Sequence, residues 1–316
     1  MDILLKNAKL LTQNEKREIL TADILIEGNT IKRIGKVTEK AEIVLDCKNK
    51  LVTPGLINTH THLAMTLLRG YADDMELNQW LTTKIWPIEA KITGNDIYHG
   101  TLLGAIELIK SGTTCFVDMY FNTGKVAEAV DKIGIRANLS YGMIDLGKKE
   151  KREKELKETE AFIKKYNNTS DGRVTCSIGP HAIYTCSEDL LLKTTELSKK
   201  YNANIQIHLS ETRKEVFDCL KEKGKRPVDY LNSIGFLSSK VIASHCVWLT
   251  KQEVKTLAKN NVKVAHDPVS NMKLASGGVT PVKEMLENNV VVSLGTDGAS
   301  SNNSLNLLET MKVTCL

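Results

Sequence analysis

Eight short apolar runs, most of them separated by longer helix-like stretches, constrain the fold of this sequence more than any other feature. The runs are LVTPGLINTHTH, TTCFVDM, IRANLSYGM, RVTCSIGPH, ANIQIHLSE, KVIASHCVWL, NVKVAHDP and NVVVSLGTDGA. Segments such as DIYHGTLLGAIELIKSG and SEDLLLKTTELSKKY lie between them. Strands that alternate with helices indicate βα units and a parallel sheet. Eight such units predict an α/β fold, a (β/α)8 barrel of the TIM type over residues 51–316.

An open, doubly wound sheet is the alternative arrangement of such units. That fold usually carries a glycine-rich phosphate loop after its first strand. Here the same position holds the sequence THTH. We therefore favour the barrel, in which catalytic groups lie at the C-terminal ends of the strands.

Residues 1–50 follow a different pattern. ILLKNAKLL, ADILIEGNTIKRIG and AEIVLDC are short alternating runs, with a turn signal at Glu27-Gly28-Asn29. Alternation with turn residues between the runs is typical of strands that pair with their neighbours. The sequence therefore predicts a small antiparallel β-sheet domain before the barrel.

Bulk composition excludes some classes of protein. A net charge of +5, from 43 basic and 38 acidic residues, gives no nucleic-acid footprint. No apolar run approaches the length of a membrane span, and the N-terminus is too charged for a signal peptide. The seven cysteines form no CxxC pair, so a disulfide framework is not expected. We expect a cytoplasmic protein with neither a nucleic-acid nor a membrane partner.

Six of the seven histidines fall at the ends of predicted strands, and a barrel would bring them to one cavity. They are His60, His62, His181, His208, His245 and His266. Only His99 lies in a helical stretch, and Asp297 ends the eighth strand. Because side chains alternate along a strand, His60 and His62 should point to one side and Thr61 to the other.

Two imidazoles on one side of a strand end can bind a single metal ion. The alternative interpretation is a pair of hydrogen-bonded polar residues that cap the strand. A catalytic zinc-type site takes about three protein ligands and a water, with imidazole and carboxylate as donors. We therefore predict a metal site formed by His60, His62, His208 and Asp297.

Four motifs, in order, resemble those of the amidohydrolase superfamily over essentially the whole chain. They are THTHL, HLSE, SHC and GTDGASSNN, after the first, fifth, sixth and eighth strands. The resemblance implies the same four metal ligands. Binuclear members usually have a bridging lysine after the fourth strand, where this chain has Gly179-Pro180-His181. One divalent ion is therefore expected, with zinc favoured and Fe²⁺ or another divalent ion as alternatives.

Other stretches resemble deaminases of 5′-methylthioadenosine, S-adenosylhomocysteine and related 5′-deoxyadenosines. They are LLRGYADDMELNQWLTTKIWPIEAKIT, FVDMYF, GPHAIYTCSE, HDPVSNMKLASG and DGASSNNSLNLLE. This resemblance implies a small nucleoside substrate, whose adenine is hydrolysed to the inosine derivative and ammonia. It also implies roles in catalysis for Glu211, His245 and Asp297, and in substrate binding for Glu89, His181, Glu211 and Asp297. Glu89 would hold the ribose hydroxyls, and Glu211 would act as the general acid.

Several details follow from individual residues. Glu211 lies three residues after His208, so the chain must turn near Ser210 for both side chains to face the site. We expect Trp80 or Trp86 to line the pocket, with helix packing as the alternative. Some relatives have an arginine where this chain has Tyr141 at the end of the third strand. Arg152 is a substitute candidate, although a solvated position on a helix is the alternative for it.

Three other interpretations remain open. Within the superfamily, the chain could be a guanine deaminase or a triazine-type hydrolase. It could instead be a non-catalytic barrel, although such relatives usually lose metal ligands. The sequence ends at LNLLETMKVTCL, inside the helix expected after the eighth strand. We therefore expect a C-terminally truncated chain with half of the small sheet, little or no activity as one outcome, and a homo-oligomer when full length.

Overall fold

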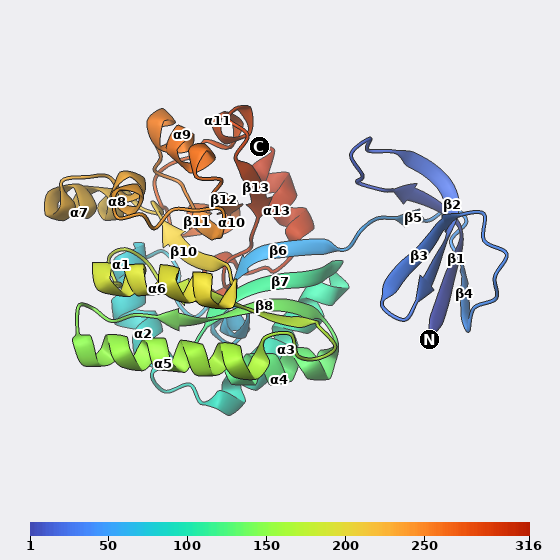
Figure 1. Cartoon of the computed structure of the whole chain (residues 1–316), viewed down its shortest axis with the longest axis horizontal. Coiled ribbons are helices and arrows are strands. Elements are labelled where there is room, and N and C mark those ends of the chain that lie inside the picture. The colour runs from blue at the N-terminus through green and yellow to red at the C-terminus, as the bar shows by residue number, and fades with distance from the viewer. The chain divides into compact units, whose positions relative to one another are not determined.

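The computed structural model describes residues 1–316, and the chain forms two compact units, Met1–Gly55 and Leu56–Leu316 (Figure 1). The first unit is a five-stranded sheet. Its strands are β1 (Asp2–Leu11), β2 (Ile19–Glu27), β3 (Thr30–Gly35), β4 (Ile43–Asp46) and β5 (Leu51–Val52). The second unit contains an eight-stranded sheet and all of the helices.

The small sheet is mixed rather than antiparallel. Strands β1, β2 and β3 form an antiparallel meander, and Gly28, with φ of 60°, lies in the predicted turn between Glu27 and Thr30. Strand β4 runs parallel to β1, so the prediction is wrong there. The reason is that the segment after β3 crosses the sheet: Val37 is buried with Leu4 and Leu25.

Leu51 and Val52 belong to this small sheet and not to the first barrel strand, contrary to the sequence prediction. Leu51 pairs with Lys9, and Val52 with Leu10, in parallel with β1. Pro54 has no backbone N–H to donate, which ends the strand pairing after β5. The first barrel strand starts at Leu56.

The eight remaining strands follow the eight predicted runs and form one parallel sheet in chain order, which confirms the α/β barrel fold. They are β6 (Leu56–Thr61), β7 (Thr113–Tyr120), β8 (Arg136–Met143), β9 (Val174–Pro180), β10 (Ile205–Leu209), β11 (Val241–His245), β12 (Lys263–His266) and β13 (Val291–Leu294). Apolar side chains such as Phe116, Leu139, Ile178, Ile207 and Val264 are completely buried between the strands and the helices.

Strands β6 and β13 are joined by individual hydrogen bonds rather than by a regular ladder. Asn58 Nδ2 donates to Thr296 Oγ1 at 2.7 Å, and Thr296 N donates to Asn58 Oδ1 at 3.1 Å. Just beyond, Asp297 N donates to His60 O at 3.0 Å. These bonds bring the two ends of the barrel sheet together and place His60 beside Asp297.

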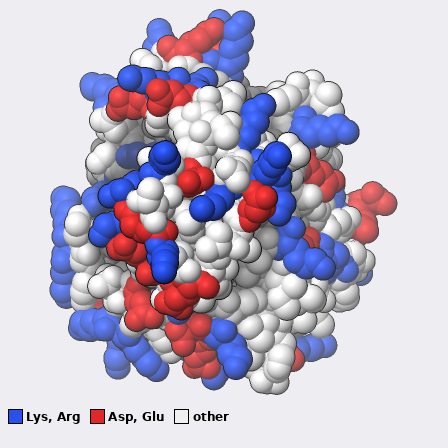
Figure 2. Space-filling view, turned by 90° about the vertical axis from the view of Figure 1, so that its right-hand side faces the viewer, with Lys and Arg blue, Asp and Glu red and all other residues white.

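Helices follow the strands, as βα units require. The longer ones are α3 (Gly94–Lys110), α4 (Thr123–Ile133), α5 (Lys149–Tyr166), α6 (Glu188–Tyr201), α7 (Arg213–Lys223), α8 (Pro227–Ser233), α9 (Lys251–Lys259) and α13 (Leu307–Thr314). Shorter ones are α10 (Pro268–Lys273), α11 (Val282–Glu287) and α12 (Ala299–Asn302). After β6 come η1 (Leu63–Leu68), α1 (Leu77–Trp80), η2 (Leu81–Ile85) and α2 (Trp86–Glu89). None of the helices combines the length and the apolar character needed to cross a bilayer. Acidic and basic side chains are interspersed on the face shown in Figure 2.

Candidate metal centre and substrate pocket

The end of β6 directs two imidazoles to one side of the strand. His60 is 1% exposed, and His62 follows the last strand residue. Thr61 turns the other way, where its Oγ1 donates to Asp118 Oδ1 at 2.8 Å. This is the arrangement that strand alternation predicts.

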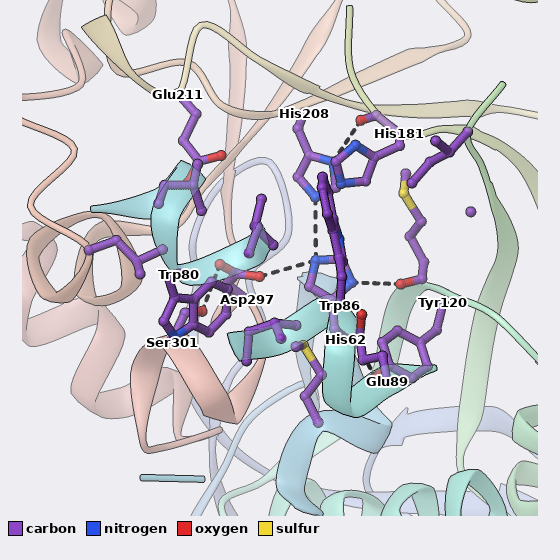
Figure 3. Close-up of a pocket in the computed structure, with 18 of the residues that line it drawn as sticks. His62, Trp80, Trp86, Glu89, Tyr120, His181, His208, Glu211, Asp297 and Ser301 are labelled. Carbon is purple, nitrogen blue, oxygen red and sulfur yellow. Dashed lines mark hydrogen bonds and ion pairs between the residues drawn. The ribbon is translucent and has the colours of Figure 1, made fainter. Parts of the chain in front are cut away.

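Four possible donor groups converge at this strand end, although they come from the end of β6, from β10 and from the segment after β13. Figure 3 shows three of them, His62, His208 and Asp297. His62 Nε2 lies 3.3 Å from His208 Nε2 and 3.2 Å from Asp297 Oδ1. His60 Nε2 lies 3.6 Å from the same Asp297 oxygen. Nitrogens of His60, His62 and His208 are close enough to one another to hold a single metal ion.

Hydrogen bonds orient two of these rings. His62 Nδ1 lies 2.6 Å from Met119 O, and His208 Nδ1 lies 2.7 Å from His181 O. Because a carbonyl oxygen only accepts, both Nδ1 atoms must donate, and each Nε2 then presents a lone pair. Metal-binding histidines are commonly oriented in this way.

His60 is buried and neither of its ring nitrogens has a hydrogen-bond partner. Burial lowers the pKa of His60 well below its usual value. Burial likewise lowers the pKa of His208. Unpartnered buried nitrogens are uncommon in proteins. Neutral imidazoles with a carboxylate are a suitable donor set for a divalent metal such as zinc.

Asp297 is held so that one carboxylate oxygen faces the histidines. Its Oδ2 accepts hydrogen bonds from Ser270 Oγ at 2.6 Å and Ser301 Oγ at 2.9 Å. Burial would raise the pKa of Asp297, but the nearby His62 and His60 outweigh this effect and lower the pKa. The group is therefore a carboxylate at neutral pH.

Glu211 reaches the same cavity because the chain turns after β10. Ser210 has a left-handed φ of 51°, which confirms the predicted turn. Glu211 Oε2 lies 3.7 Å from His245 Nε2. Burial, and secondly the charge of Asp297, raise the pKa of Glu211 to about 8. A carboxyl group with that pKa is largely protonated at neutral pH and can donate a proton.

A cavity of about 750 Å³, including its mouth, opens beside these groups. Its wall is mainly apolar, and both Trp80 and Trp86 line it, where the sequence predicted one of them. The other apolar residues of the wall are Met65, Leu77, Leu81, Ile85, Met119, Tyr120, Phe121, Ile144 and Leu274. A mainly apolar wall with a few convergent polar groups is typical of small-molecule sites.

Glu89 and His181 also line the cavity, from α2 and from the segment after β9. Glu89 Oε1 accepts a hydrogen bond from Tyr120 OH at 2.7 Å, and burial raises the pKa of the Glu89 carboxyl. His181 Nδ1 lies 2.9 Å from Thr185 Oγ1, and burial lowers the pKa of His181 to about 3. In Figure 3 His181 lies beside His208 and Glu89 beside Tyr120, with His62 between the two pairs.

Two residues considered from the sequence lie elsewhere. Tyr141 lies beside Glu155 and does not line the cavity. Arg152 is engaged in ion pairs, with Asp145 at 3.4 Å and with Asp189 at 3.0 Å. Neither residue is therefore available to a molecule in the cavity.

Sequence reasoning also missed two buried carboxyl groups and misplaced one histidine. His266 does not line the cavity. Its neighbour Asp267 instead has Oδ2 within 3.5 Å of His245 Nδ1, which also lies 3.0 Å from Asn271 Oδ1. Consecutive residues at a strand end point to opposite sides, so the HDP sequence was the available signal. The second carboxyl group is Glu215, whose oxygens accept hydrogen bonds from the backbone beside Glu211.

Comparison with known proteins agrees with this geometry. Residues 51–316 match the model of the amidohydrolase family. A protein named 5′-deoxyadenosine deaminase, from Methanobrevibacter smithii, is 50% identical over 99% of this chain and 72% of its own length. A 5-methylthioadenosine/S-adenosylhomocysteine deaminase from Thermococcus sibiricus is 49% identical over the whole chain and 74% of its own length.

A solved structure gives the same result at the level of the fold. An adenosine deaminase from Xanthomonas campestris with bound zinc superimposes with a TM-score of 0.89 at 28% sequence identity. The match covers 99% of this chain and 74% of that structure. Because the family model spans most of the chain and the relatives match along its full length, this chain belongs to the amidohydrolase family.

Proposed function

We propose that this protein is a metal-dependent hydrolytic deaminase of 5′-substituted adenosines. The reaction would convert the adenine of 5′-deoxyadenosine, 5′-methylthioadenosine, S-adenosylhomocysteine or adenosine to the inosine derivative and release ammonia. Relatives about 50% identical that are named for such activities support this proposal. The observation that carries it is the position of Glu211, a buried carboxyl that lines the same cavity as His62, His208 and Asp297.

We propose that His60, His62, His208 and Asp297 hold one divalent metal ion. The unpartnered nitrogens of His60 and the facing Nε2 atoms of His62 and His208 support this assignment. Zinc is the metal favoured, and Fe²⁺ or another divalent ion is the alternative. When bound, such an ion supplies Lewis-acid activation of water near neutral pH.

Three side chains of this protein would then move or hold protons. Asp297, ionised at neutral pH, would take a proton from the attacking water. Glu211 would deliver a proton to the ring nitrogen next to C6 and later help one to reach the departing ammonia. His245, 3.7 Å from Glu211, would hydrogen-bond the attacking oxygen and stabilise the charge that develops there.

The wall of the cavity would bind the rest of the nucleoside. The Glu89 carboxyl, close to Tyr120, would accept hydrogen bonds from the ribose hydroxyls. His181, in the segment after β9, would also contact the substrate. The faces of Trp80 and Trp86 offer apolar surface to the purine. A cytoplasmic location and a homo-oligomer remain predictions.

An ammonia-release assay tests the proposal. The panel contains the four adenosine derivatives above, together with guanine and an amino-substituted triazine, each of which would release ammonia on hydrolysis, with and without added zinc. Turnover of the ribosides and not of the other two supports the proposed function. Preference for guanine or the triazine would instead assign the chain to another amidohydrolase activity. Absence of turnover on every compound, with metal bound, would favour a non-catalytic role.

A further inference from the structure

Glu215 is a buried carboxylate that has no cationic partner. It is 4% exposed, and no lysine, arginine or histidine forms an ion pair with it. Its two oxygens instead accept backbone hydrogen bonds, from Ser210 N at 2.8 Å and from Glu211 N at 2.8 Å. A buried polar group is unfavourable unless it is hydrogen-bonded, so these two bonds account for its position.

The location of these bonds differs from that of an ordinary helix cap. Glu215 is the third residue of α7, whose N-cap is Thr212. In a capping box the carboxylate at this position returns to the N–H of the N-cap residue. Asp96 does so in α3, where Thr93 N donates to Asp96 Oδ2 at 2.8 Å. The carboxylate of Glu215 reaches past Thr212 to the two residues before it.

The peptide that Glu215 holds is in an unfavourable conformation. Ser210 has φ of 51°, a region that residues with a Cβ seldom adopt. On the other side, Ser210 O accepts a hydrogen bond from Trp248 N at 2.8 Å. The turn after β10 is therefore held by bonds from two different elements, α7 and the segment after β11.

The side chain of Glu211 has no comparable support. No protein group donates a hydrogen bond to its carboxyl, and the one ion-pair contact of the carboxyl, with His245 Nε2, is long at 3.7 Å. Figure 3 shows the side chain extending into the open cavity. Its position therefore depends on the backbone from which it projects, and the backbone N–H of Glu211 is bound by Glu215.

From these contacts we infer that Glu215 is a positioning residue: its carboxylate holds the Ser210–Glu211 turn so that the Glu211 carboxyl faces the reacting ring. The inference rests on the proposed function, in which Glu211 transfers the protons. A displacement of about 1 Å in a catalytic group can lower the rate by about 10²-fold.

The test combines two readouts on Glu215→Gln. Glutamine has one acceptor, and its NH₂ group would face a backbone donor, so one of the two bonds must be lost. Hydrogen–deuterium exchange of peptides that contain residues 210 and 211 should become faster than in the parent. In the ammonia assay, kcat should fall by roughly 10- to 100-fold, with KM changed less than about threefold and metal content unchanged.

A double-mutant cycle separates positioning from a general loss of structure. In a Glu211→Gln background, Glu215→Gln should lower the residual rate by less than about twofold, because the group that it positions is already gone. Equal losses in both backgrounds would overturn the inference. The control is Asp96→Asn, which removes a cap at the same helical position but does not line the cavity; it should leave exchange at 210–211 and kcat unchanged.

Two outcomes distinguish this inference from the proposed function. If the parent deaminates nothing but exchange at 210–211 rises in Glu215→Gln, the holding role stands and the proposed reaction fails. If the parent is active and Glu215→Gln retains both its exchange and its kcat, the inference is wrong. Glu215→Asp, which is one methylene too short to reach both N–H groups, gives the same test with a smaller loss of kcat should the glutamine variant not fold.

Discussion

The Nε2 atoms of His62 and His208 lie 3.3 Å apart, although 146 residues separate the two histidines in the sequence. Both rings donate Nδ1–H to backbone carbonyls, of Met119 and His181. Each Nε2 therefore presents a lone pair, and two lone pairs at this distance repel each other. A cation between the rings would turn the repulsion into two favourable contacts, with Asp297 Oδ1 3.2 Å from His62 Nε2 as the anionic ligand.

We predict one divalent metal ion per chain. Chelation should lower the melting temperature, because a ligand that binds only the folded state stabilises it by about 2.7 kcal/mol at 100 times its Kd. Elemental analysis and thermal melting with and without chelator measure both quantities. His62→Ala should lose the metal, whereas His99→Ala, at an exposed position of α3, should keep it. Two ions per chain would show that the interpretation of Gly179-Pro180-His181 is wrong.

A second prediction concerns proton transfer. Glu211→Gln should keep the metal and bind substrate, but lose about 10²–10⁴-fold in kcat, because the amide has the size of the acid and no proton to give. Single-turnover rates, together with metal analysis and the affinity for an inosine product, would separate chemistry from binding. Turnover equal to that of the parent would remove Glu211 from the mechanism.

The barrel could be predicted from the sequence because its signal is local. Each apolar run and each helical stretch is visible without knowledge of its neighbours, and strand alternation places His60 and His62 together. The assignment of Leu51 and Val52 failed because their partner is β1, more than forty residues earlier, as the pairing of Lys9 with Leu51 shows. Pairing over such a distance leaves no mark in the run itself.

Some residues of the candidate site could be predicted from the sequence, and others could not. Residues at strand ends were predictable because barrel topology brings strand ends together. Glu215 was not, because its sequence position is that of an ordinary residue in the first turn of a helix. Only the three-dimensional path of the Ser210 turn brings two N–H groups within 2.8 Å of its carboxylate. The prediction that His266 shares this cavity was wrong, because His266 ends a strand but its side chain does not line the cavity.

A third prediction tests ribose recognition. Glu89→Ala should weaken binding of ribosides by about 1–3 kcal/mol, because it leaves sugar hydroxyls without a partner. Tyr120→Phe is the matched control, since it removes the 2.7 Å hydrogen bond to Glu89 and leaves the carboxyl in place. We expect KM for adenosine to rise more in Glu89→Ala than in Tyr120→Phe. An unchanged KM in Glu89→Ala would favour packing as the role of Glu89 and a free base as the substrate.

The last prediction concerns the 5′ substituent, and it rests on the charges of the cavity wall. Glu89, Glu211 and Asp297 line the cavity, and no lysine or arginine does. The carboxylate of S-adenosylhomocysteine would find no cation there, whereas 5′-deoxyadenosine and 5′-methylthioadenosine need none. A missing charged hydrogen bond is worth about 1.5–3 kcal/mol, so kcat/KM should favour the neutral substrates by roughly 10- to 100-fold.

Gly142→Arg adds a cation to the wall, at a site where a Cβ would lie at an ordinary 3.5 Å from Met119 Cγ. It should raise the relative rate on S-adenosylhomocysteine, and Tyr141→Arg, beside Glu155 and outside the cavity, should not. A parent enzyme that prefers S-adenosylhomocysteine would show that its carboxylate is bound by groups beyond this wall.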